Sequence, residues 1–138
     1  MSNQDEFLQT LENYRYGVSQ VLPGYISGRF TDLEALPDEL GLVLYSRDVL
    51  ARILAAGDPF AQAHLSEIDT LDRQLLEIKD DLLPLIPAYS HLRQRLPRPR
   101  SQWWYYLDEI VSTPLAPTLK ASRYWLPLTP QPAPSVPA

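Results

Sequence analysis

Apolar side chains, with one histidine among them, recur at alternating spacings of three and four residues between positions 58 and 85. Their positions are Ala61, His64, Ile68, Leu71, Leu75, Ile78, Leu82 and Leu85. This spacing places them on one face of an α-helix that packs against other helices. Asp58 is a favourable N-cap, Pro59 suits the first helical position, and Pro84 ends or kinks a helix. We therefore predict that this stretch is the central helix of a small helical domain.

The same periodicity predicts two longer helices before the central one. The first runs from residue 3 or 4 to about residue 22, and Pro23-Gly24 is expected to stop it. Its apolar positions are Phe7, Leu11, Tyr14, Val18 and Val21. The second runs from about residue 37 to residue 56, with Gly57 as its C-cap. Its apolar stripe consists of Leu40, Val43, Leu50 and Leu54, with Arg47 intruding. A short turn then makes the second and central helices antiparallel neighbours.

The C-terminal third has a different character, because nine of the 14 prolines lie from Pro97 onward. Two further short helices are predicted, at about residues 88–96 and 102–112, with an extended segment between them. The expected fold is therefore all-α, a small bundle of four to five helices around a central long helix. We predict one helical domain at residues 1–112 and a proline-rich, extended or disordered tail at residues 113–138.

Charge and composition narrow the classes of function. The net charge of −5 disfavours non-specific binding to nucleic acid or to an anionic membrane by the molecule as a whole. Cysteine is absent from the sequence, which excludes disulfides, thiol catalysis and thiolate zinc sites and fits a reducing compartment. The N-terminus is acidic, unlike a signal peptide, and no run of 18 apolar residues occurs. These features predict a cytoplasmic protein without a transmembrane segment.

Candidate chemistry is sparse. His64 and Glu67 lie one helical turn apart and share the spacing of a metal-binding pair, but no second pair of this kind occurs to complete a helical metal site. The interpretation without a metal site is a solvated acidic face with one histidine at its edge. Serine-nucleophile and glycine-rich phosphate motifs are absent from the sequence. We therefore expect no catalytic residue, no metal, no cofactor and no enzymatic activity.

The strongest candidate for a binding surface is a basic and aromatic segment at residues 93–106. It combines arginines with large aromatic residues: Arg93, Arg95, Arg98, Arg100, Trp103, Trp104, Tyr105 and Tyr106. Arginine suits carboxylates, phosphates and aromatic faces, so the composition fits an acidic protein partner, a nucleic acid or a peripheral membrane contact. The arginines can equally pair with the acidic face of the protein's own central helix. In a helix, half of the aromatic block would pack on the core and half would stay partly exposed. Tyr124 and Trp125 form a second aromatic anchor in the tail.

The segment from Ser101 to Glu109, which reads SQWWYYLDE after a Pro-Arg-Pro-Arg lead, resembles small uncharacterised all-helical proteins of cyanobacterial type. The resemblance covers this segment and the general helical plan. It implies a cytosolic setting and a non-enzymatic accessory role, and it carries no functional residues across.

These observations together predict a non-enzymatic helical protein-interaction module: an adaptor, an assembly factor or a regulatory subunit. Its partner is expected to be another protein or a second copy of the chain, as in a homodimer. The alternative is a nucleic-acid or membrane-surface binder that acts through residues 93–106, although the net negative charge makes nucleic acid the less favoured ligand.

Overall fold

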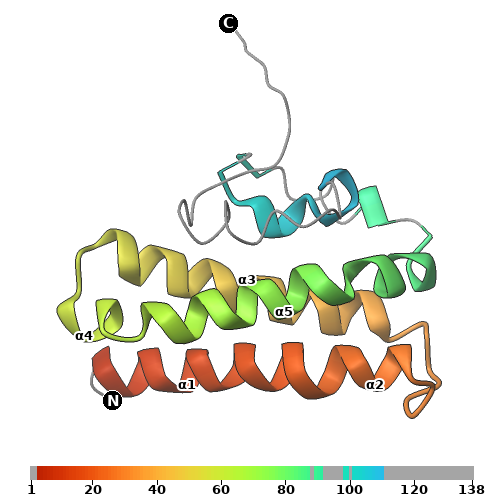
Figure 1. Ribbon diagram of the computed structural model, residues 1–138, viewed down its shortest axis with the longest axis horizontal. Coiled ribbons are helices and arrows are strands. Elements are labelled where there is room, and N and C mark those ends of the chain that lie inside the picture. The colour runs from red at the N-terminus through yellow and green to blue at the C-terminus, as the bar shows by residue number, and fades with distance from the viewer. Residues whose placement is uncertain (1–2, 88, 92–97, 100, 111–138) are drawn as a thin grey trace, which may run out of the picture. The chain divides into compact units, whose positions relative to one another are not determined.

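The computed structural model describes residues 3–87, 89–91, 98–99 and 101–110, and these residues form helices and turns without any strand. The elements are α1 (Asn3–Tyr16), η1 (Gly17–Val21), α2 (Leu22–Ile26), α3 (Leu36–Ala55), α4 (Pro59–Gln62), α5 (Leu65–Leu82), η2 (Leu83–Leu85), η3 (Trp103–Tyr105) and η4 (Leu107–Glu109). The all-α fold class is thus confirmed (Figure 1). The chain divides into two compact units, Met1–Pro87 and Ala88–Ala138. The predicted tail, residues 113–138, lies outside the described residues.

The first predicted helix is a longer rod made of α1, η1 and α2. Its middle part, η1, is a π-helix. The prediction that Pro23-Gly24 stops the helix is wrong, because Pro23 lies in the first turn of α2, where a missing backbone N–H matters least. The rod ends instead at Ile26, with Ser27 as its C-cap before Gly28, which has a positive φ of 82°. The π segment also shifts the buried register, so that Leu22 is buried in place of the predicted Val21.

Gly17 allows the rod and α3 to approach closely at the start of the π segment. A Cβ atom added at Gly17 would lie 2.4 Å from Cγ2 of Val43 on α3, which is too close for any real contact. A side chain at this position would therefore force the rod and α3 apart. The glycine that weakens the helix locally has a packing role here.

The second predicted helix is confirmed as α3, which carries Asp38 and Glu39 in its first turn. The helix ends at Ala55 with Ala56 as its C-cap, and Gly57 follows with a φ of 81°, the left-handed conformation that glycine adopts most easily. The predicted stripe of Leu40, Val43, Leu50 and Leu54 is buried, as is the intruding Arg47.

The predicted central helix consists of two helices. Asp58 caps α4 as expected, because its side chain accepts a hydrogen bond from the backbone N–H of Phe60 at 2.9 Å. The chain then turns at Ala63 and His64 before α5 begins. This break gathers the rings of Phe7, Phe60 and His64, whose centroids lie between 5.0 and 6.0 Å apart. The helix that the periodicity alone makes continuous is therefore interrupted where these rings meet. At the other end, α5 gives way to η2 at Leu83, one residue before Pro84.

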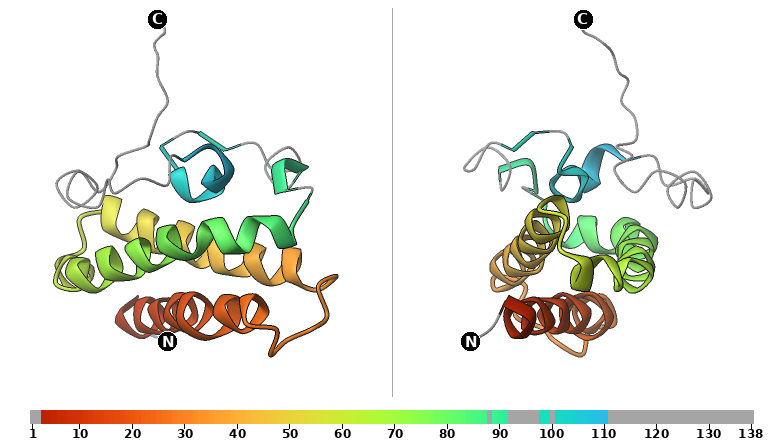
Figure 2. Two further views of the ribbon diagram at one scale, coloured as in Figure 1. Left: turned by 45° about the vertical axis from the view of Figure 1, so that its right-hand side comes forward. Right: turned by 90° about the vertical axis from the view of Figure 1, so that its left-hand side faces the viewer.

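The core of the first unit lies where α3 and α5 both pack on the rod from α1 to α2 (Figures 1 and 2). Each element contributes fully buried apolar side chains. They include Phe7, Leu11, Val18 and Leu22 from the rod, Leu36, Leu40, Leu44 and Leu50 from α3, and Ile68, Leu75 and Leu82 from α5. The described parts of the second unit include the two short 3-10 turns η3 and η4. The predicted helix at residues 102–112 is therefore wrong over its described part.

Candidate functional site

A buried charged network connects the three longest helices of the first unit. Asp72 of α5 accepts hydrogen bonds from Arg47 of α3 through both carboxylate oxygens, at 2.8 Å from Nε and 3.0 Å from a terminal guanidinium nitrogen. The hydroxyl of Tyr14 on α1 donates to the same carboxylate at 2.7 Å. All three side chains are almost completely buried. One carboxylate thus receives three donors from two other helices.

The electrostatics of this network follow from burial and from the charge of Asp72. Burial, followed by the nearby Asp72 carboxylate, raises the pKa of Tyr14 well above its ordinary value. Burial alone would lower the pKa of Arg47, but the Asp72 carboxylate outweighs it, so the pKa of Arg47 is raised. Arg47 is therefore charged and Tyr14 neutral at physiological pH. The geometry is that of a structural connection, which fixes the register of α1, α3 and α5.

A second ion pair joins α1 to α5 nearer the surface. Arg15 donates from Nε to Glu67 at 2.7 Å and also pairs with Glu12 one turn earlier on its own helix. The hydrogen bond to Glu67, against a smaller effect of burial, raises the pKa of Arg15. Glu67 therefore faces a cation, and the ring of His64 has its Nδ1 3.0 Å from the backbone oxygen of Phe60. Among the residues that the structure describes, no three His, Asp or Glu side chains gather as a metal site would require.

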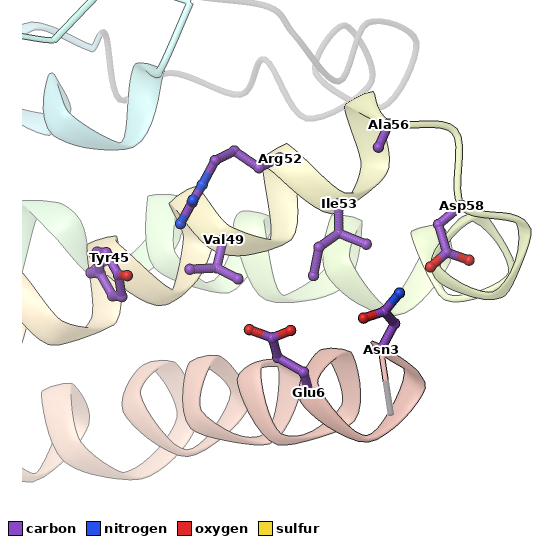
Figure 3. A pocket seen from close by; sticks show the side chains of 8 residues that line it. All are labelled: Asn3, Glu6, Tyr45, Val49, Arg52, Ile53, Ala56 and Asp58. Carbon is purple, nitrogen blue, oxygen red and sulfur yellow. The ribbon is translucent and has the colours of Figure 1, made fainter. Parts of the chain in front are cut away.

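The outer face of α3 presents an apolar surface that the core does not use. Leu42 is 66% exposed and Tyr45 is 55% exposed, which makes Leu42 one of the most exposed large apolar residues in the described chain. Val49 continues this line along the helix and is half-buried. Beside it lies a groove of about 440 Å³ between α1 and α3 (Figure 3). Its lining residues are Asn3, Glu6, Tyr45, Val49, Arg52, Ile53, Ala56 and Asp58.

Part of the predicted basic and aromatic segment is described, within the second unit. Trp103, Trp104 and Tyr105 are all buried and Tyr106 is half-buried, so less of the aromatic block stays exposed than the predicted half. The 3-10 turn η3 does not distribute consecutive side chains as the predicted α-helix would. The guanidinium of Arg98 lies 4.8 Å from the ring centroid of Tyr105, a cation–π contact inside the unit. The remaining predicted partner-binding residues, Arg93, Arg95, Arg100, Tyr124 and Trp125, lie outside the described residues.

Two features of the first unit, the buried charged network and the exposed outer face of α3, are not predicted from the sequence, although the sequence contains a sign of each. Arg47 was recognised as an intrusion in an apolar stripe, which is the mark of a buried charge that needs a partner. Asp72 directly follows Leu71 of the predicted apolar face, and its sequence position alone places it beside the acidic, solvated face of the helix. The outer face of α3 has its own regular spacing, which becomes apparent once the buried stripe is known.

Comparison of the chain with protein-family models, with curated proteins and with solved structures found no match. None of the helices in the described part of the chain is long and apolar enough to cross a membrane. We therefore infer function from the surfaces and contacts of the chain itself.

Proposed function

We propose that this chain is a non-enzymatic protein-interaction module of the cytoplasm, an adaptor, assembly factor or regulatory subunit that binds through the outer face of α3. The observation that carries the proposal is the exposure of Leu42 and Tyr45 on a long helix whose other face is fixed in the core. Exposed large apolar and aromatic residues that lie together are typical of protein interfaces.

The rigidity of α3 supports this role. The pairing of Arg47 with Asp72 holds α3 against its neighbours, and Gly17 lets α1 approach α3 closely. A surface whose backbone is already ordered loses less conformational entropy on binding. The groove beside Val49 and Ile53 offers a partner side chain a place to insert (Figure 3).

The partner class follows from the chemistry of this face. Its centre is apolar, and its rim carries both signs of charge, with Glu6 and Asp58 near Arg52 around the groove. A phosphate backbone or an anionic lipid surface requires a basic face, which this is not. An apolar centre with a mixed polar rim is the composition of a protein–protein interface.

A photo-crosslinking residue placed at Tyr45 tests this proposal in a native extract. We expect an adduct with a protein of discrete mass. The same probe at Tyr16, which is 56% exposed on α1, serves as the matched control and is expected to give no such adduct. Absence of a protein adduct at position 45, or an adduct that nuclease or lipid extraction removes, would contradict the proposal.

A further inference from the structure

The outer face of α3 has a regular seam with a symmetric distribution of charge. Its residues follow spacings of four and three and are Asp38, Leu42, Tyr45, Val49, Arg52 and Ala56. All of them are exposed except the half-buried Val49. An acid lies at one end, apolar residues lie in the middle, and a base lies near the other end. Asp38 and Arg52 are each seven residues, or about two helical turns, from Tyr45.

From this symmetry we infer that the face binds a second copy of the chain, with two α3 helices antiparallel across a two-fold axis at Tyr45. The inference rests on the proposed function and names its partner. In a two-fold pairing the same surface serves both subunits, so that a contact from one residue to another occurs twice. The axis at Tyr45 places Asp38 of one copy opposite the partner's Arg52, and Arg52 opposite the partner's Asp38.

Charge complementarity distinguishes this arrangement from a parallel one. In a parallel pair, Asp38 would face the partner's Asp38 and Arg52 would face the partner's Arg52, and both contacts are repulsive. Neither residue has an ion pair within the part of the chain that the structure describes. Both are therefore available to an intermolecular contact. The antiparallel arrangement is the one in which every charge of this seam meets its opposite.

Gly41 is a second observation that points to a helix lying on this face. It sits inside α3, where glycine costs helix stability relative to alanine. A Cβ added there would meet nothing within 4 Å, so no contact within the described chain requires a glycine. The position borders the seam, and the axis at Tyr45 brings it opposite the partner's Val49. A residue without a side chain permits the close approach of a second helix at this point.

The groove completes the fit. Leu42 of one copy lies between the partner's Tyr45 and Val49 when the axis is at Tyr45. Val49 and Tyr45 line the groove between α1 and α3, which also contains Ile53 (Figure 3). The highly exposed Leu42 thus meets the apolar side chains of this mixed groove on the partner, and the symmetry repeats this contact. Two such insertions on either side of a central pair of Tyr45 rings make one continuous apolar interface.

Sedimentation of the purified full chain over a range of concentrations tests the inference. We expect a reversible monomer–dimer equilibrium for the unaltered protein. Leu42→Glu introduces a charge twice at the centre of the interface and should weaken dimerisation by about a hundredfold or more. Leu8→Glu is the matched control, because Leu8 is 42% exposed on α1 and lies outside the seam, so its dimerisation should be unchanged.

A charge exchange tests the antiparallel geometry. Asp38→Arg alone and Arg52→Asp alone each place like charges opposite one another and should weaken dimerisation about tenfold, whereas the double exchange should restore it. Circular dichroism checks that every variant is folded. The inference is overturned if the double exchange fails to restore dimerisation. It is also overturned if Leu42→Glu dimerises as well as the unaltered protein. A chain that stays monomeric at all concentrations overturns it as well.

The crosslink at Tyr45 separates this outcome from failure of the proposed function. A monomeric chain whose Tyr45 probe captures a different protein keeps the proposed function and loses the second copy. A monomeric chain whose probe captures no protein loses both. An adduct of twice the chain mass, together with restoration by the charge exchange, supports both.

Discussion

The two faces of α3 invert the usual distribution of residues. The inner face carries Arg47 into the core, where it is 3% exposed, while the outer face leaves Leu42 66% exposed. The inner charge is stable because Arg47 pairs with the Asp72 carboxylate, to which the Tyr14 hydroxyl also donates. The exposed apolar residues of the outer face are compatible with a folded monomer, because the surface of a folded protein always includes some apolar area. Burial on one helix is thus decided by the partners available to each face, and hydrophobicity alone assigns neither Arg47 nor Leu42 correctly.

Removal of the Asp72 carboxylate, which pairs with the inner face of α3, is expected to have the largest effect on stability. Asp72→Ala leaves Arg47 buried without its counterion and should lower the free energy of unfolding by about 3–5 kcal/mol. Urea unfolding measures this loss. Glu77→Ala on the exposed side of α5 is the control, with an expected change within about 0.5 kcal/mol. Replacement of Arg47, Tyr14 and Asp72 together by Met, Phe and Leu should cost less than Asp72→Ala alone, and a larger loss would mean that packing, and not the unpaired charge, dominates.

Loss of the Tyr14 hydroxyl should have a smaller effect on stability than loss of the Asp72 carboxylate. Tyr14→Phe removes one hydrogen bond to a buried carboxylate but keeps the ring in the core. We expect the free energy of unfolding to fall by about 1.5–3 kcal/mol, the range for hydrogen bonds to charged groups. Chemical denaturation at neutral pH gives the value. A change near zero would show that Arg47 alone satisfies Asp72.

Alkaline pH should lower the free energy of unfolding through Tyr14 of the buried network. Its pKa is raised by burial and by Asp72, so above about pH 10 the unfolded chain releases this proton while the folded chain keeps it. Stability from this group is therefore complete below pH 10 and declines as pH rises, by up to about 1.4 kcal/mol per pH unit. Unfolding curves of the wild type and Tyr14→Phe between pH 9 and pH 11 should converge. A difference in the free energy of unfolding that stays constant over this pH range would contradict a raised pKa for Tyr14.

On the outer face, Gly41→Ala should act in opposite directions on folding and on association. Alanine favours the helix, and its Cβ meets nothing within the described chain, so the free energy of unfolding of the monomer should rise by about 0.5–1 kcal/mol. The same Cβ obstructs a second α3 and should weaken dimerisation. Thermal unfolding at low concentration and sedimentation at high concentration measure the two effects. A variant that gains stability and dimerises as well as the wild type would argue against close approach at Gly41.

The smallest effect on folding is expected for Leu42→Ser. At a dilution where the chain is monomeric, this exposed position should change the free energy of unfolding by no more than about 0.5 kcal/mol. At high concentration the wild type should gain stability from dimerisation by mass action, and the variant should not. Melting temperatures recorded over a range of concentrations separate these cases. A large loss at high dilution would mean that Leu42 serves the fold itself.

The elements of the first unit were largely predictable, because the signals that define them are local. The spacing of apolar residues located α1, α3 and most of α5, and Asp58 and Gly57 marked helix ends through their own backbone preferences. The candidate site was not predictable to the same extent. The composition of the sequence favours the basic and aromatic segment, in which Trp103, Trp104 and Tyr105 are buried and Tyr106 is half-buried.

From the sequence alone it follows that the chain is helical, that one helix lies between about residues 37 and 56, and that Arg47 is out of place in the apolar stripe of that helix. Only the tertiary structure decided that Arg47 meets Asp72 and Tyr14, since these residues come from three separate helices. It also decided that the predicted central helix breaks at His64, where aromatic rings from α1 and α4 gather. Local preferences extend over a few residues, whereas burial depends on which distant side chains share the same space. The exposure of the outer face of α3 therefore follows from the tertiary contacts that bury its inner face.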